Sequence, residues 1–130
     1  NSFNHYAYGA IEELMMSHSL GIQRDEKNPG YKHIILQPEI GGELDYVKGG
    51  FESMQGYIGS RWEKRKNGYT YGVTVPGNTS ASLFLPANKA SGIKLLKGKE
   101  GASFVSYKNG KVQYELKSGT YEFVCTCPAN

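Results

Sequence analysis

The chain has 130 residues, of which 38% are hydrophobic and 21% charged, and its formal net charge is +3. This length suits one domain, and the composition excludes an intrinsically disordered chain. No apolar run approaches the ~20 residues that span a membrane. The one basic cluster, Arg61–Lys66, contains Glu63 and is expected to be a solvated strand end rather than a nucleic-acid site. We therefore expect a globular domain that binds neither membranes nor nucleic acids.

The first element expected is an amphipathic helix that ends at Leu20. Ala7, Ile11 and Leu14 recur at the 3.6-residue spacing of one helix face, and Gly21 follows as a residue that commonly ends helices. A single helix ahead of a β domain must bury its apolar face on that domain or on a preceding helical domain. If that partner is absent, the exposed face favours self-association.

Residues 23–31 are polar and end in a Pro-Gly turn signal, so we interpret them as a connector. About eight or nine short strands follow at spacings of ~8–12 residues, a pattern typical of an antiparallel β-sandwich. Two Asn-Gly pairs, Asn67-Gly68 and Asn109-Gly110, predict hairpins, the first with a type I′ turn. The expected strands cover residues 31–37, 44–53, 55–63, 69–75, 79–85, 93–96, 103–107, 111–116 and 120–125.

Two features of the strands bear on function. Trp62 alternates in phase with Ile58, which predicts an inward-facing side chain. Cys125 and Cys127 lie two apart near the end, at the distance limit for a disulfide within one strand. We expect both to be reduced thiols, because a metal site needs more ligands than this pair.

No complete catalytic constellation can be identified from the residues. Glycosidase chemistry generally needs two carboxyl groups flanking the scissile bond, and the 12 acidic residues offer no convincing pair. His18 and His33 follow apolar spacings and are expected to be packing or capping residues. His5 differs, because it lies in the first helical turn, where donors for sugar hydroxyls or anions are found. We expect no catalytic residue, metal or cofactor within the chain.

The segment NSFNHYAYGA at residues 1–10 resembles the C-terminal end of bacterial α-L-rhamnosidases of glycoside hydrolase family 78. Similar residues continue through about residue 86, and beyond it only the β-rich character matches. The matching positions are Ser2 to Ala10, Gly21-Ile22, Asp25-Glu26, Pro29 to His33, Pro38, Gly56, Ile58, Trp62, Val73, Val75-Pro76 and Leu85-Pro86.

The resemblance implies a mainly β fold, an antiparallel sandwich preceded by one helix left over from a catalytic (α/α)6 barrel. Residues 1–22 would be the terminal barrel helix, residues 23–31 the connector and residues 32–130 the sandwich. In the family, one glutamate acts as acid and another as base, with inversion at the anomeric carbon, and both lie upstream of this chain. The fragment alone would be inactive, and the substrate-binding role would fall on His5, with Asn4 positioning it. The partners implied are the missing barrel and a rhamnose-containing glycoside or polysaccharide.

Two alternatives remain open. A carbohydrate-binding module would stack sugar rings on exposed aromatic side chains, for which ten tyrosines and Trp62 are available. An independent structural domain would pack residues 1–20 on its own sandwich. The cellular compartment does not follow from the sequence.

Overall fold

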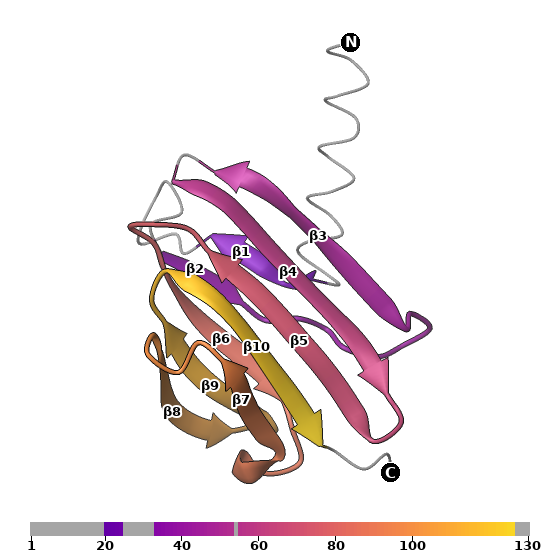
Figure 1. Cartoon of the computed structure of the whole chain (residues 1–130). Helices are drawn as coiled ribbons and strands as arrows, with labels where there is room; N and C mark the ends of the chain where they lie inside the picture. The colour runs from indigo at the N-terminus through magenta and orange to yellow at the C-terminus, as the bar shows by residue number, and fades with distance from the viewer. Residues whose placement is uncertain (1–19, 25–32, 54, 127–130) are drawn as a thin grey trace.

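The computed structural model describes residues 20–24, 33–53 and 55–126, which form two facing five-stranded sheets (Figure 1). In spatial order, the first sheet contains β1 (Ile22–Arg24), β2 (His33–Leu36), β6 (Ser80–Pro86), β9 (Lys111–Leu116) and β8 (Ala102–Lys108). The second contains β3 (Tyr46–Ser53), β4 (Gly56–Arg65), β5 (Gly68–Val75), β10 (Gly119–Thr126) and β7 (Ile93–Lys97), with the 3-10 turn η2 (Ala90–Gly92) before β7. The mainly β sandwich is confirmed.

The core lies between the sheets and follows the period-two alternation of the strands. Ile58, Ser60 and Trp62 of β4 point inward and are buried, while their neighbours face solvent. Trp62 is only 1% exposed, so the expectation of an inward-facing indole is confirmed. The opposite sheet contributes Ile34, Leu36, Leu83, Leu85 and Val112 to the same cluster.

Three features of the fold differ from what the sequence predicts. Strand β1 was not predicted, because it has only three residues. One of them, Ile22, is apolar, so the strand shows no alternation of apolar and polar side chains. Strands β2 and β6 are parallel, since the chain builds β3, β4 and β5 on the other sheet before it returns beside β2. Among the described non-glycine residues only Asn78 and Asn109 have positive φ, so the type I′ turn predicted at Asn67-Gly68 is wrong, whereas Asn109-Gly110 has positive φ at both positions.

The junction before β1 is anchored in the sandwich. Leu20 and Ile22 are buried in the core, and a Cβ on Gly49 of β3 would lie 2.9 Å from Leu20 Cδ1. Gly21 has φ +69°, and its carbonyl accepts a 2.9 Å hydrogen bond from the Gln37 backbone N–H. The β domain therefore begins earlier than residue 32, and it includes the first two residues of the expected connector, which lie in β1. The expected helix before Leu20 lies outside the described residues.

Cys125 is buried and disulfide-bonded, which corrects the expectation of a reduced thiol. That expectation assumed both cysteines within one strand, whereas β10 ends at Thr126. Cys127, the chain's other cysteine, lies outside the described residues. In the part of the chain that the structure describes, no helix has the length and apolar character needed to cross a bilayer.

Candidate functional site

The substrate-binding residues expected from the sequence, His5 and Asn4, lie outside the described residues. The structure therefore brings neither of them into a site, and their role stays a prediction. The same holds for His18 and for four of the acidic residues, which are Glu12, Glu13, Asp25 and Glu26.

The described carboxylates form no catalytic pair. All eight are exposed or half-buried, and Glu115 and Glu122, the two half-buried ones, lie on different sheets. General-acid chemistry needs a carboxyl group whose surroundings favour its protonated form, and burial is the usual means. Among the described residues there is also no group of three or more His, Cys, Asp or Glu side chains that could hold a metal ion.

His33 has a structural environment on the outer face of the first sheet. Its Nδ1 lies 2.6 Å from Ser80 Oγ and its Nε2 lies 2.9 Å from Ser82 Oγ, so the ring joins β2 to two positions of β6. In a catalytic triad with a serine nucleophile, one histidine nitrogen faces the serine and a carboxylate usually orients the other. Here both nitrogens contact hydroxyls, so the cluster matches the packing role expected for His33.

Several tyrosines are locked into the core rather than offered to ligands. Burial raises the pKa of Tyr69 and of Tyr71 well above the usual value. The Tyr69 hydroxyl donates to the Pro86 carbonyl at 2.7 Å, and the Ser60 hydroxyl donates to the Tyr71 oxygen at 3.0 Å. Trp62 and these tyrosines are therefore unavailable for sugar stacking.

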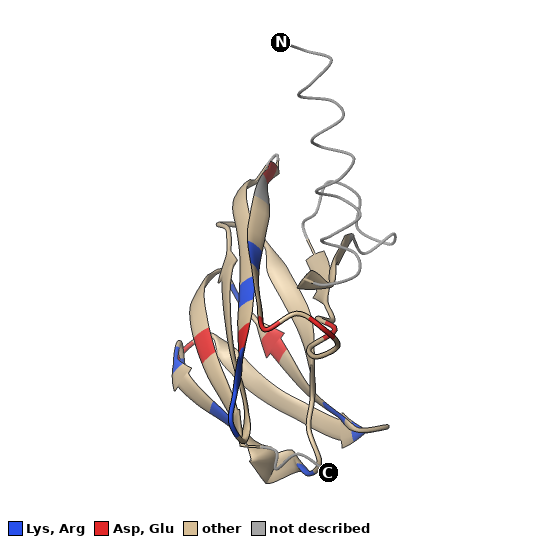
Figure 2. Ribbon diagram, turned by 90° about the vertical axis from the view of Figure 1, so that its right-hand side faces the viewer, with Lys and Arg blue, Asp and Glu red and all other residues tan. Residues whose placement is uncertain are grey.

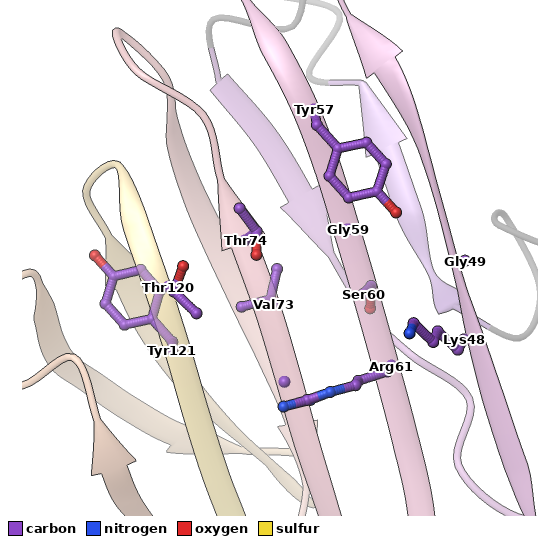
Figure 3. A pocket seen from close by; sticks show the side chains of 11 residues that line it. Lys48, Gly49, Tyr57, Gly59, Ser60, Arg61, Val73, Thr74, Thr120 and Tyr121 are labelled. Carbon is purple, nitrogen blue, oxygen red and sulfur yellow. The ribbon is translucent and has the colours of Figure 1, made fainter.

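The opposite face of the β3–β4–β5–β10 sheet is different, and we call it the outer sheet face. A shallow depression of about 130 Å³ opens on it. The side chains that line it from this face are those of Lys48, Tyr57, Arg61, Thr74 and Thr120 (Figure 3). This volume is well below the ~300–1,000 Å³ of pockets that enclose a drug-sized ligand, so the depression is a platform and not an enclosed active site.

Glycines on neighbouring strands shape this platform. Gly50 and Gly59 pair directly across β3 and β4, and the Tyr57 ring covers both. A Cβ on Gly59 would lie 2.6 Å from ring atom Cε2, and one on Gly50 would lie 2.6 Å from the Tyr57 hydroxyl oxygen. The ring is therefore laid along the sheet while 47% of the residue remains exposed.

Arg61 crosses the sheet in the next row of residues. Its guanidinium passes over Gly72, where a Cβ would lie 2.6 Å from Cζ, and Nη2 reaches Glu122 Oε1 at 2.9 Å. Only a glycine at this position leaves room for that path. Both side chains are more than 40% exposed, so the pair contributes little to stability, typically ~0–1 kcal/mol.

A second depression of about 400 Å³ lies on the other side of this ion pair. Its lining includes Tyr46, Glu63, Arg65 and Leu96, together with Arg61 and Glu122. The four charged groups pair with one another, since Arg65 Nη2 lies 3.5 Å from Glu63 Oε1 and Arg61 bonds Glu122.

Sequence reasoning did not find this platform. Alternation places Tyr57 and Arg61 on a solvent face, but solvent faces of strands commonly carry such residues. The only local signal was the frequency of glycine within β3, β4 and β5, because glycine inside a strand often marks close approach of another group. Basic and acidic positions are interspersed over the strands, so charge patterning gave no further guide (Figure 2).

Comparison with known families places this geometry in context. Residues 21–100 match the family model described as the bacterial alpha-L-rhamnosidase C-terminal domain. The chain belongs to this family. The match begins at Gly21 and runs through β7, so it covers the junction, β1 and the outer sheet face as far as β5.

Similar whole proteins are much longer than this member of the family. An alpha-L-rhamnosidase of Streptomyces avermitilis is 33% identical over 123 residues, which are 95% of this chain and 11% of that protein. One from Formosa agariphila is 31% identical over 131 residues, covering 95% of this chain and 14% of that protein. The chain thus spans little more than a tenth of the length of these curated relatives.

Solved structures show the same fold. The crystal structure of Streptomyces avermitilis alpha-L-rhamnosidase complexed with L-rhamnose matches 94% of this chain and 11% of that one, with a TM-score of 0.78 and 31% identity. The alpha-L-rhamnosidase structure from Dictyoglumus thermophilum matches 92% of this chain and 14% of that one, with a TM-score of 0.74 and 20% identity. At that lower identity the likeness shows the fold alone.

Proposed function

We propose that this chain serves as the C-terminal β-sandwich domain of an inverting α-L-rhamnosidase, which releases terminal α-L-rhamnose from glycosides or polysaccharides. The observation that carries the proposal is the match to the family model over residues 21–100. Agreement of the fold with the Streptomyces avermitilis enzyme over 94% of the chain supports it.

The domain itself is non-catalytic in this proposal. None of the described carboxylates is buried, and the two that line the second depression, Glu63 and Glu122, are each paired with an arginine. The catalytic acid and base would come from the preceding barrel. The domain would support that barrel, and the anchoring of Leu20 and Ile22 in the sandwich core would fix the chain where it leaves the barrel.

His5 is the residue of this chain that would contact rhamnose, with Asn4 positioning it. We infer this from the sequence resemblance and from the position of His5 in the first turn of the expected helix. Loss of one buried hydrogen-bonding contact to a sugar typically costs ~1–3 kcal/mol, or roughly 5- to 150-fold in kcat/KM.

Activity assays on two proteins test the proposal. The isolated 130-residue chain should not hydrolyse an aryl α-L-rhamnoside, because it lacks both carboxylates. In the intact enzyme, His5→Ala should lower kcat/KM at least ~5-fold, whereas Lys94→Ala, at an exposed position of β7, should leave it unchanged. Turnover by the isolated chain that persists through purification and disappears on mutating one of its own residues would contradict the non-catalytic assignment.

Light scattering addresses the role of residues 1–20. If residues 1–19 form part of the last barrel helix, removing them while keeping the buried Leu20 should reduce self-association of the isolated chain, since an apolar face would otherwise be exposed. A stable monomer with or without these residues would favour an independent structural domain.

A further inference from the structure

We propose that the depression beside Tyr57 on the outer sheet face is a binding site for a saccharide unit that carries a carboxylate. This site goes beyond the supporting role proposed above and does not depend on rhamnosidase activity. It uses the exposed ring of Tyr57 as a stacking surface, Lys48 as the partner of the carboxylate, and the hydroxyls of Thr74 and Thr120 as hydrogen-bonding groups.

The exposed aromatic plane is the first argument. Pyranose rings present patches of C–H groups that pack on aromatic faces, and aromatic side chains combine large contact area with defined geometry. Tyr57 is 47% exposed, and Gly50 and Gly59 allow its ring to lie along the sheet instead of standing away from it. Glycine in the middle of a strand lowers the stability of that strand and often marks the close approach of another group, which here is the Tyr57 ring.

Unpartnered polar groups around the ring are the second argument. Within the described part of the chain, Lys48 forms no ion pair or hydrogen bond, and the side-chain hydroxyls of Thr74 and Thr120 are likewise without a partner. Thr74 and Thr120 face each other across β5 and β10, so two hydroxyls flank one side of the depression. Such convergent polar groups beside an aromatic face provide hydrogen bonds and orientation for a polar ligand.

Charge decides between the two depressions and selects an acidic ligand. The cations around Tyr46 are both paired with carboxylates, Arg61 with Glu122 and Arg65 with Glu63. The Tyr57 depression has the same Arg61 on one side and the unpaired ammonium of Lys48 opposite it on β3. A ligand carboxylate gains an ion pair only beside Lys48, where no protein carboxylate competes for it.

A protein partner fits this surface less well. Lys and Glu are depleted in the centres of protein interfaces, and this face carries Lys48 and Glu122. Of the other exposed apolar side chains, Tyr46 and Leu96 line the second depression of the same sheet, whereas Phe104 and Val105 lie on β8 of the opposite sheet. The Arg61–Glu122 ion pair separates Tyr57 from Tyr46 and Leu96, so the surroundings of Tyr57 are polar, which suits a sugar better than an apolar protein surface.

The test titrates the ¹⁵N-labelled 130-residue chain with methyl β-D-glucuronide and methyl β-D-glucoside. The two sugars differ only at C6, which is a carboxylate in the first and a hydroxymethyl group in the second. We expect saturable shifts at the backbone amides of Tyr57, Gly59, Thr74 and Thr120 below ~20 mM glucuronide, with at least threefold weaker binding of the glucoside. That preference should disappear between ~0.02 M and ~0.5 M NaCl, because salt screens the exposed ion pair.

Variants separate the ring from the charge. Tyr57→Ala should weaken binding of both sugars about tenfold, equivalent to ~1.4 kcal/mol. Tyr57→Leu still covers the two glycines but has no aromatic plane, so it gives the same loss even if the alanine variant folds poorly. Lys48→Gln should remove the preference for glucuronide alone. Tyr46→Ala and Lys94→Gln, at exposed positions of the same sheet outside the depression, should leave both affinities within twofold.

Three results would overturn the proposal. The first is the absence of saturable shifts up to ~20 mM of either sugar, which would exclude binding stronger than ~2–3 kcal/mol. The second is an equal loss in Tyr46→Ala and Tyr57→Ala, which would place the ligand elsewhere or make binding non-specific. The third is protection of Tyr57 relative to Tyr46 in hydroxyl-radical footprinting of the intact, sugar-free enzyme, because the catalytic domain would then cover this face.

Discussion

Replacement of Gly21 by alanine should strongly destabilise the domain, because this residue joins the preceding segment to the sandwich core. Its φ of +69° lies in the left-handed region, which costs a non-glycine residue ~1–2 kcal/mol. An added Cβ would also meet the backbone carbonyl carbon and oxygen of Gln37 and the backbone nitrogen of Pro38. None of these atoms belongs to a flexible side chain that could move aside.

The magnitude follows from what has to shift. Separating the two backbones breaks the hydrogen bond from the Gln37 N–H to the Gly21 carbonyl, which costs ~1–3 kcal/mol when its groups stay buried. Displacement of the adjacent core residues Leu20 and Ile22 adds ~1–3 kcal/mol of packing loss. With the left-handed penalty, and less a gain of ~0.4–1 kcal/mol from the stiffer unfolded chain, we expect a total of about 5 kcal/mol.

Gly42→Ala is the matched control. Gly42 has φ +67°, almost the same as Gly21, but a Cβ there would meet nothing within 4 Å. It should therefore show only the left-handed penalty, offset in part by the unfolded-state gain, for a net cost of about 1 kcal/mol. The difference between the two variants isolates the close backbone approach at Gly21.

Urea unfolding followed by Trp62 fluorescence measures both variants, since the indole is 1% exposed when folded. With an m-value of ~2 kcal/mol/M, Gly21→Ala should lower the midpoint by ~2.5 M and Gly42→Ala by ~0.5 M. Equal shifts would refute the reasoning, because they would mean that backbone conformation alone sets the cost and that Gln37 does not approach Gly21 closely.

Two further predictions concern the buried tyrosines and the strand glycines. Burial raises the folded-state pKa of Tyr69 and Tyr71, so their contribution to stability is fully present below pH ~10 and is lost as pH rises further, by ~1.4 kcal/mol per pH unit for each residue. Urea midpoints at pH 9 to 11 should fall steeply in the wild type and less steeply in a Tyr69→Phe/Tyr71→Phe variant; identical slopes would contradict the assignment. Gly50→Ala should cost about 2 kcal/mol, because its Cβ meets a backbone carbonyl on β4, whereas Gly72→Ala should change stability by less than ~1 kcal/mol, because only an exposed guanidinium must move. A larger cost at Gly72 than at Gly50, measured by the same unfolding assay, would reverse this interpretation.

The sequence by itself determined the fold class and most strand positions. Alternation placed Ile58 and Trp62 inward because side chains of a strand point to opposite faces with a period of two. The Asn-Gly pair at residues 109 and 110 also located a hairpin, and both of its residues have positive φ. The resemblance in residues 1–86 indicated the family that the comparison with the family model confirmed.

Tertiary structure decided what depends on contacts between distant segments. The parallel pairing of β2 with β6, the early start of the domain at Leu20 and the short strand β1 arise from such contacts, and no local period encodes them. The platform is of the same kind, because Tyr57 comes to lie over Gly50 only through the register of β3 on β4. Propensity and periodicity act over a few neighbouring residues, whereas a surface that could hold a ligand is assembled from several strands at once.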